Sequence, residues 1–166
     1  MPLKTTPNHI KFGEVYLGID PGASGGLCLL DGSDSVAIKM PDTERDVWDW
    51  LCDVPIKRAF AVIEKVGGYI GTPQPGSAMF KFGQSVGGLR MALIGAMIPF
   101  EEITPQRWQN GLGIVKRAKD ESKGQFKNRL KQRAQQLHPR LNVTLATADA
   151  ILIATYCQRK RQGGLQ

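Results

Sequence analysis

The sequence predicts an α/β fold in which helices flank a mixed sheet of five strands. Five short segments, most of them apolar, have the length of strands, while longer segments repeat apolar residues at helical spacing. The chain has 166 residues, the usual size of one domain, and shows no internal repeat. We therefore expect a single domain over 1–166, with flexible ends at about 1–13 and 161–166.

The first three predicted strands form an antiparallel meander. They cover residues 15–19, 25–30 and 35–39, and the segments PGAS and DGSD supply the turns between them. The fourth strand, 59–63, is apolar throughout, which is typical of a strand covered on both faces, and it stops at Glu64. Residues 99–103 form the fifth strand.

Cap residues and apolar spacing predict the helices. Thr43 or Asp42 can cap a helix that runs to about Cys52. Residues 67–77 are rich in glycine and proline and predict a loop that overhangs Glu64, and 77–97 then form a long helix. Pro105 suits the first position of a short helix or turn.

Two further helices follow in the last third of the chain. Ser122 and Gln125 match a capping box, after which apolar residues recur on one stripe as far as residue 137. Thr147 is expected to cap a final helix that has Asp149 in its first turn. The helix dipole favours an anion there.

Three isolated carboxylates lie at the ends of these elements. Asp20 follows the first strand, Glu64 follows the fourth, and Asp149 shares a helix face with Ile153 and Cys157 that should point towards the sheet. Each acid also has a purely structural interpretation, as a turn residue, a strand end or a partner of the helix dipole. Together they predict ligands that converge on one or two hard cations.

Composition narrows the class of protein. Lys and Arg outnumber Asp and Glu by 22 to 15, and the formal net charge of +7 suits a polyanionic partner. Cys28, Cys52 and Cys157 are widely spaced and odd in number, which favours neither a disulfide framework nor a zinc site. The first residues lack the apolar core of a signal peptide, and no run is long enough to span a bilayer. We expect a soluble, cytoplasmic protein with no membrane association.

Several motifs together resemble a known family. These are GIDPG, VIEKV, FGQSVGGLRMALI, ITPQRW and TADAILIATYC, in that order along the chain. They look like those of a RuvC-type Holliday junction resolvase, most of all its short phage and prophage branch. The resemblance implies a ribonuclease H-like fold and a homodimer that uses Mg²⁺ to cut two opposed strands of a four-way DNA junction.

The resemblance also implies roles for individual residues. Asp20, Glu64 and Asp149 match the family's metal-binding acids, and Lys123 matches a lysine that faces the scissile phosphate. The sequence departs from the family at Ala146, where another acidic residue is usual. With three carboxylates, the second ion would depend more on waters and phosphate oxygens, so that either activity persists or metal affinity is reduced.

Four further residues have two interpretations each, as contacts to DNA or as ordinary packing and surface residues. Tyr69 lies where the family carries an aromatic residue that stacks on junction bases, and Gln84 matches a helix used at the catalytic face and the dimer contact. Lys127 and Lys131 are interpreted as surface or non-specific DNA backbone contacts. No chemistry is assigned to Trp108.

The resulting hypothesis is hydrolysis with two Mg²⁺ ions, or Mn²⁺, per site, in which one ion activates a water and the other stabilises the leaving oxygen. Asp20 would bridge both ions, Glu64 and Asp149 would complete their shells, and Lys123 would offset charge on the phosphate. One alternative is a branched-DNA-binding protein that has lost catalysis, which Ala146 suggests. Another is an ATP binder of the actin or sugar-kinase type, although those proteins duplicate this domain and the chain has no phosphate-binding loop.

Overall fold

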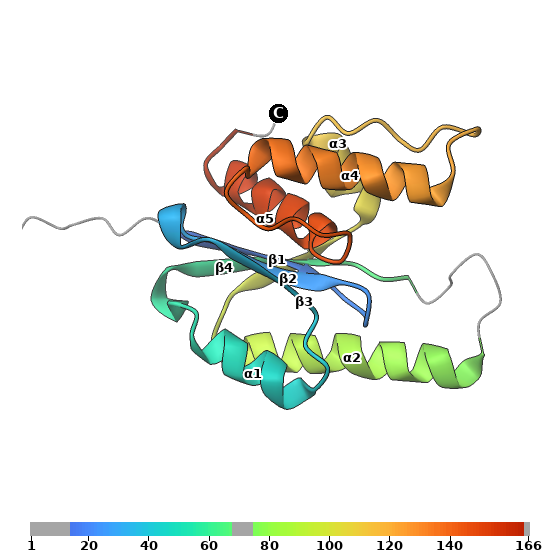
Figure 1. Ribbon diagram of the computed structural model, residues 1–166. Coiled ribbons are helices and arrows are strands. Elements are labelled where there is room, and N and C mark those ends of the chain that lie inside the picture. The colour runs from blue at the N-terminus through green and yellow to red at the C-terminus, as the bar shows by residue number, and fades with distance from the viewer. Residues whose placement is uncertain (1–13, 68–74, 165–166) are drawn as a thin grey trace, which may run out of the picture.

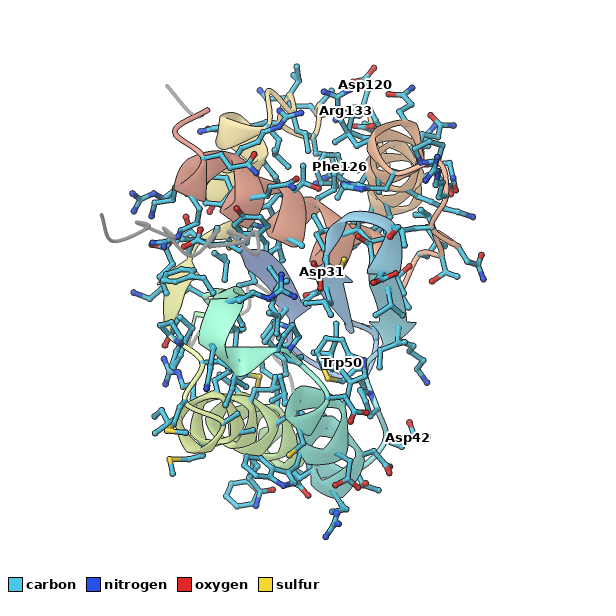
Figure 2. The ribbon with its side chains drawn as sticks, turned by 90° about the vertical axis from the view of Figure 1, so that its left-hand side faces the viewer. Asp31, Asp42, Trp50, Asp120, Phe126 and Arg133 are labelled. Atoms are coloured by element: carbon cyan, nitrogen blue, oxygen red, sulfur yellow. The ribbon has the colours of Figure 1, made fainter. Side chains whose placement is uncertain are left out.

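The computed structural model describes residues 14–67 and 75–164 and has three layers. Figure 1 shows a central sheet with α1 and α2 on one face and α3, α4 and α5 on the other. Figure 2, turned by 90°, shows the same layers with Trp50 on the α1 side of the sheet and Phe126 on the α4 side. The helices are α1 (Glu44–Cys52), α2 (Gly76–Gly95), α3 (Pro105–Gly111), α4 (Lys123–Leu137) and α5 (Ala148–Arg161).

The sheet is mixed, and within the described residues it has five strands in the order β3-β2-β1-β4-β5. Its strands are β1 (Val15–Asp20), β2 (Gly26–Leu30), β3 (Val36–Lys39), β4 (Ala59–Glu64) and β5 (Phe100–Ile103). The pairs β1–β2 and β2–β3 are antiparallel, whereas β1–β4 and β4–β5 are parallel. This confirms the predicted meander and the predicted mixed five-stranded sheet.

Strand alternation decides which face each side chain occupies. Leu17 of β1 and Ala61 of β4 belong to the core between the sheet and α2. This core includes Leu89 and Leu93 of α2. Their neighbours in sequence point the other way and join the core around α5. Because side chains along a strand alternate with period two, Asp20 and Glu64 also face α5.

Helix α5 lies unusually close to β1. All of its residues from 148 to 157 are buried, so it has no solvent-facing side over that length. A methyl group at Gly18 would lie 2.1 Å from the Ala150 carbonyl oxygen and 2.2 Å from the Ala154 nitrogen. Only glycine therefore allows this approach of helix and strand.

Three of the predicted caps can be compared directly with the structure. The Thr43 hydroxyl accepts a hydrogen bond from the backbone of Asp46, and Ser122 and Gln125 form the predicted capping box. Thr147 directly precedes α5, as predicted, but its side chain does not cap the helix. It hydrogen-bonds to Thr144 instead, in a local turn that competes with capping.

The strand boundaries lie within one residue of the prediction, and the larger differences are at helix ends. Helix α2 ends at Gly95, two residues before the predicted end, because the chain turns at Met97 with a positive φ of 56°. At the C-terminus, α5 extends to Arg161, whose guanidinium pairs with Glu14 at 2.5 Å. The end of the helix is thus held beside the start of β1.

No helix in the described ranges is long and apolar enough to cross a membrane.

Substituting Gly18 with alanine should destabilise the fold, because the new methyl group would overlap the backbone of α5. Overpacking costs about 1–3 kcal/mol or more, and each kcal/mol shifts Tm by about 2–4 °C in a chain of this size. Gly83→Ala on α2 is the control, since a methyl group there meets open space. Its Tm should stay equal or rise, because alanine favours a helix. Thermal unfolding by circular dichroism measures both, and equal Tm values for Gly18→Ala and the parent chain would contradict the close contact.

Candidate active site

The three predicted acids meet at one end of the sheet. Asp20 is the last residue of β1 and Glu64 the last of β4, and these strands are parallel neighbours with Ile19 opposite Ile63. Asp149 lies in the first turn of α5, one residue before the backbone that contacts Gly18. Each carboxylate acts electrostatically on at least one of the others. The topology therefore brings together residues that are 129 positions apart in sequence.

Asp20 is the most strongly perturbed of the three. Burial and the nearby Asp149 and Glu64 carboxylates together raise the pKa of its carboxyl group to about 8, against an opposing effect of Lys127. A buried anion next to two others is costly because neither water nor an opposite charge compensates it fully. Burial and the neighbouring negative charges thus both disfavour the ionised form of Asp20.

Glu64 is positioned by a residue to which the sequence analysis assigned no chemistry. The indole Nε1 of Trp108 donates a hydrogen bond of 2.7 Å to Oε2 of Glu64. Burial raises the pKa of Glu64, and this hydrogen bond opposes the rise. Trp108 is fully buried in α3, which follows β5, and β5 pairs with β4. The motif ITPQRW contained this signal, because it places a tryptophan one turn after the strand that neighbours Glu64.

Lys127 is the cation that pairs with the acidic cluster. Its ammonium group contacts Oδ2 of Asp149 and interacts electrostatically with Asp20 and Glu64. Burial works to lower the pKa of Lys127, but the three carboxylates outweigh that effect and the pKa is raised. The side chain remains 48% exposed, so its head group can be reached from solvent. Lys127 is thus exposed, as a surface lysine or a DNA backbone contact would be, and the structure adds its ion pair with Asp149.

The donor set suits a hard divalent cation. Carboxylate oxygens are preferred ligands of Mg²⁺ and Mn²⁺, and the Asp149 side chain is only 8% exposed. Its Oδ1 atom is buried and, in the part of the chain that the structure describes, has no hydrogen-bond partner. Among the described residues, no group of three or more His, Cys, Asp or Glu side chains has the arrangement of a metal site. The chemistry of the residues fits a cation, and a bound cation would relieve both the repulsion and the unpaired oxygen.

The other predicted DNA contacts are less closely connected to this cluster. Lys123 is exposed at the first position of α4, one turn before Lys127. Gln84 lies on α2, across the sheet from α5, where it lines a groove of about 310 Å³ between α1 and α2. Lys131 is partly buried on α4. Tyr69 lies outside the described residues.

The Trp108→Phe variant should lose stability in a pH-dependent manner. A hydrogen bond to a charged group contributes about 1.5–3 kcal/mol, and phenylalanine keeps an apolar ring but lacks the donor. The loss should be larger above the pKa of Glu64, where the carboxylate is ionised, than near pH 4. Urea unfolding near pH 4 and above the pKa of Glu64 measures the loss of unfolding free energy at each pH. Trp48→Phe, on the exposed side of α1, is the control. A loss that is the same at both pH values would indicate only a packing defect.

Asp20→Asn should stabilise the protein at pH 8 when divalent ions are absent. The folded-state pKa of Asp20 lies above its unfolded value, so the wild type has its full stability below about pH 4 and loses it as the pH rises to about 8. Asparagine cannot ionise and avoids this loss. We expect a Tm several degrees above that of the wild type at pH 8 in chelator, and no such gain near pH 4. A variant that is less stable at both pH values would contradict the described burial.

Comparisons with known proteins agree with the architecture. No family model and no curated protein matched the chain. Among solved structures, Thermus thermophilus RuvC is 17% identical, with a TM-score of 0.59 over 92% of this chain and 98% of that chain. T. thermophilus RuvC in complex with Holliday junction substrate is 16% identical, with a TM-score of 0.61 and the same coverage. The chain therefore has a RuvC-like fold, which confirms the expected ribonuclease H-like architecture.

Proposed function

We propose that this protein is a structure-selective endonuclease that resolves four-way DNA junctions by metal-dependent hydrolysis. The meeting of Asp20, Glu64 and Asp149 at one end of a RuvC-like sheet carries the proposal. Buried carboxylates that repel one another are costly to a fold, and a functional cation site is the usual reason to retain them. The substrate is suggested by the RuvC neighbour whose structure contains a Holliday junction.

Positive charge lies at the same end of the molecule as the acids. Lys116, Arg117, Lys119 and Lys123 are exposed in the segment before α4 and at its start. Figure 1 shows this segment along the outer side of the α3 and α4 layer, where it enters α4 on the side of the picture at which β4 ends. Such residues would hold the phosphate backbone without reading sequence, and affinity should fall steeply as salt rises.

A homodimer would place two such sites on one junction, so that paired, symmetric nicks result. The surface of α2 supports this proposal, because Phe80, Met91, Ile94 and Met97 on and just beyond it are each more than half exposed. Large apolar side chains gathered on one element commonly mark a protein interface. Gln84 and Tyr69 remain proposed contacts to the branched DNA.

The roles of the residues follow from their contacts. Asp20, Glu64 and Asp149 would hold Mg²⁺ or Mn²⁺, which when bound supplies an activated water and charge stabilisation of the leaving oxygen. Trp108 fixes the orientation of the Glu64 carboxylate through its indole hydrogen. Lys127 and Lys123 offer positive charge to the scissile phosphate from α4. Hydrolysis of this kind leaves 5′-phosphate ends.

A second candidate is a branched-DNA-binding protein without catalysis. It is favoured by Ala146, which has no carboxylate, and by the existing ion pair between Lys127 and Asp149. The two candidates differ in a titration of Mg²⁺ and Mn²⁺ with an end-labelled junction. Binding without cutting at every concentration supports the second candidate.

Asp20→Asn and Glu64→Gln should bind four-way junctions with unchanged affinity but cut them at least about a hundredfold more slowly. Even residues that only support metal ligands cost about 10–100-fold when removed, so a direct ligand should cost more. The assay compares a four-way junction, a flap and a linear duplex in Mg²⁺, and measures binding in chelator. Asp34→Asn, at the exposed turn between β2 and β3, is the control and should cut normally. Normal cutting by either acid variant would remove that residue from the reaction centre.

A further inference from the structure

The two carboxylate oxygens of Asp149 have different environments, because Lys127 contacts only one of them. Oδ2 receives the ammonium group of Lys127, while Oδ1 is buried and without a partner among the described residues. One oxygen of Asp149 thus already has a cation from the protein itself. The other oxygen has no partner of its own, and a cation bound beside it would supply one.

Position 146 lies beside the strand pair that carries Asp20. Gly26 is the register partner of Asp20, and a methyl group at Gly26 would lie 2.8 Å from the carbonyl oxygen of Ala146. An acidic side chain at this position would begin next to the cluster. Alanine adds no charge and no ligand there, so the site has three carboxylates and no fourth from this turn.

The charges near the site then balance with a single divalent ion. Three ionised carboxylates and one ammonium group leave two negative charges in excess, which one Mg²⁺ or Mn²⁺ neutralises. A second divalent ion would leave the site with excess positive charge while competing with the ammonium group for Oδ2 of Asp149. This argument concerns the fixed charges of the chain and needs no change in protonation of Lys127.

We infer that Lys127 takes the place of one of the two expected cations, so that each site binds a single divalent ion on the Oδ1 side of Asp149. The inference rests on the proposed function and replaces its expected pair of ions by one ion and one ammonium group. Lys127 would thereby stabilise charge that a second metal would otherwise stabilise. Lys127 differs in this ion pair from Lys123, which is exposed one turn earlier on the same helix.

Counting bound Mn²⁺ without DNA tests the inference independently of cutting. The free ion is measured by electron paramagnetic resonance during titration of the intact chain at neutral pH. The wild type and Lys127→Arg, which keeps the charge, should each bind one Mn²⁺ per protomer. Lys127→Met should bind two, or bind its first ion about tenfold or more tightly, because a nearby charge changes such equilibria by about that factor. Lys123→Met has the same substitution on the same helix and should bind one ion with wild-type affinity.

Each other outcome has a distinct meaning. Two ions per wild-type protomer would overturn the role of Lys127 and leave the metal-dependent nuclease in place. One ion of unchanged affinity in Lys127→Met would also overturn it, provided that thermal unfolding shows the variant to be folded. Lys127→Gln, which keeps a polar head group, repeats the test if the methionine variant does not fold. A wild type that binds no Mn²⁺ would overturn the inference and the proposed metal-dependent function together.

Discussion

The close contact between α5 and β1 is the constraint on which the candidate site depends. At Gly18 the helix backbone lies against the strand with no side chain between them, which sets the first turn of α5 at the end of β1. Because β4 runs parallel to β1 and ends beside it, Asp149 then meets both Asp20 and Glu64. Burial of α5 from 148 to 157 anchors this arrangement by apolar contacts that are independent of the acids themselves. The core thus supplies the free energy that holds three like charges together.

The site is consequently a place where the fold accepts electrostatic cost. Asp20 has a pKa raised to about 8 by burial and by its acidic neighbours, and Asp149 keeps one oxygen without a partner in the described structure. A fold selected for stability alone would replace such groups by apolar residues, since isolated buried charges are seldom stabilising. Trp108 and Lys127 reduce the cost without removing it. What remains is negative charge that the folded state compensates only in part.

Local patterns in the sequence predicted the strands, most helix ends and the convergence of the acids, because strand alternation and helix caps are short-range properties. They did not predict the partners of those acids. The hydrogen bond from Trp108 to Glu64 joins residues 44 positions apart, and depends on where α3 lies after β5. Lys123 and Lys127 are one turn apart on the same helix, so periodicity cannot distinguish them. Leu130 and Ala134 of α4 pack into the core around α5, and this tertiary contact determines that Lys127 is the one that lies beside the acids.

Ala146 and Lys127 change the charge of the site in the same direction. An acid at 146 would add a negative charge beside Asp20, whereas Lys127 adds a positive charge at Asp149. With the acid present and the lysine absent, the excess would be four negative charges, which matches two divalent ions rather than one. The two positions are on different elements, yet both act on a cluster whose geometry is set by α5 and β1. Under the proposed function, residues around the carboxylates would therefore set the number of cations that the site needs, without any movement of the carboxylates themselves.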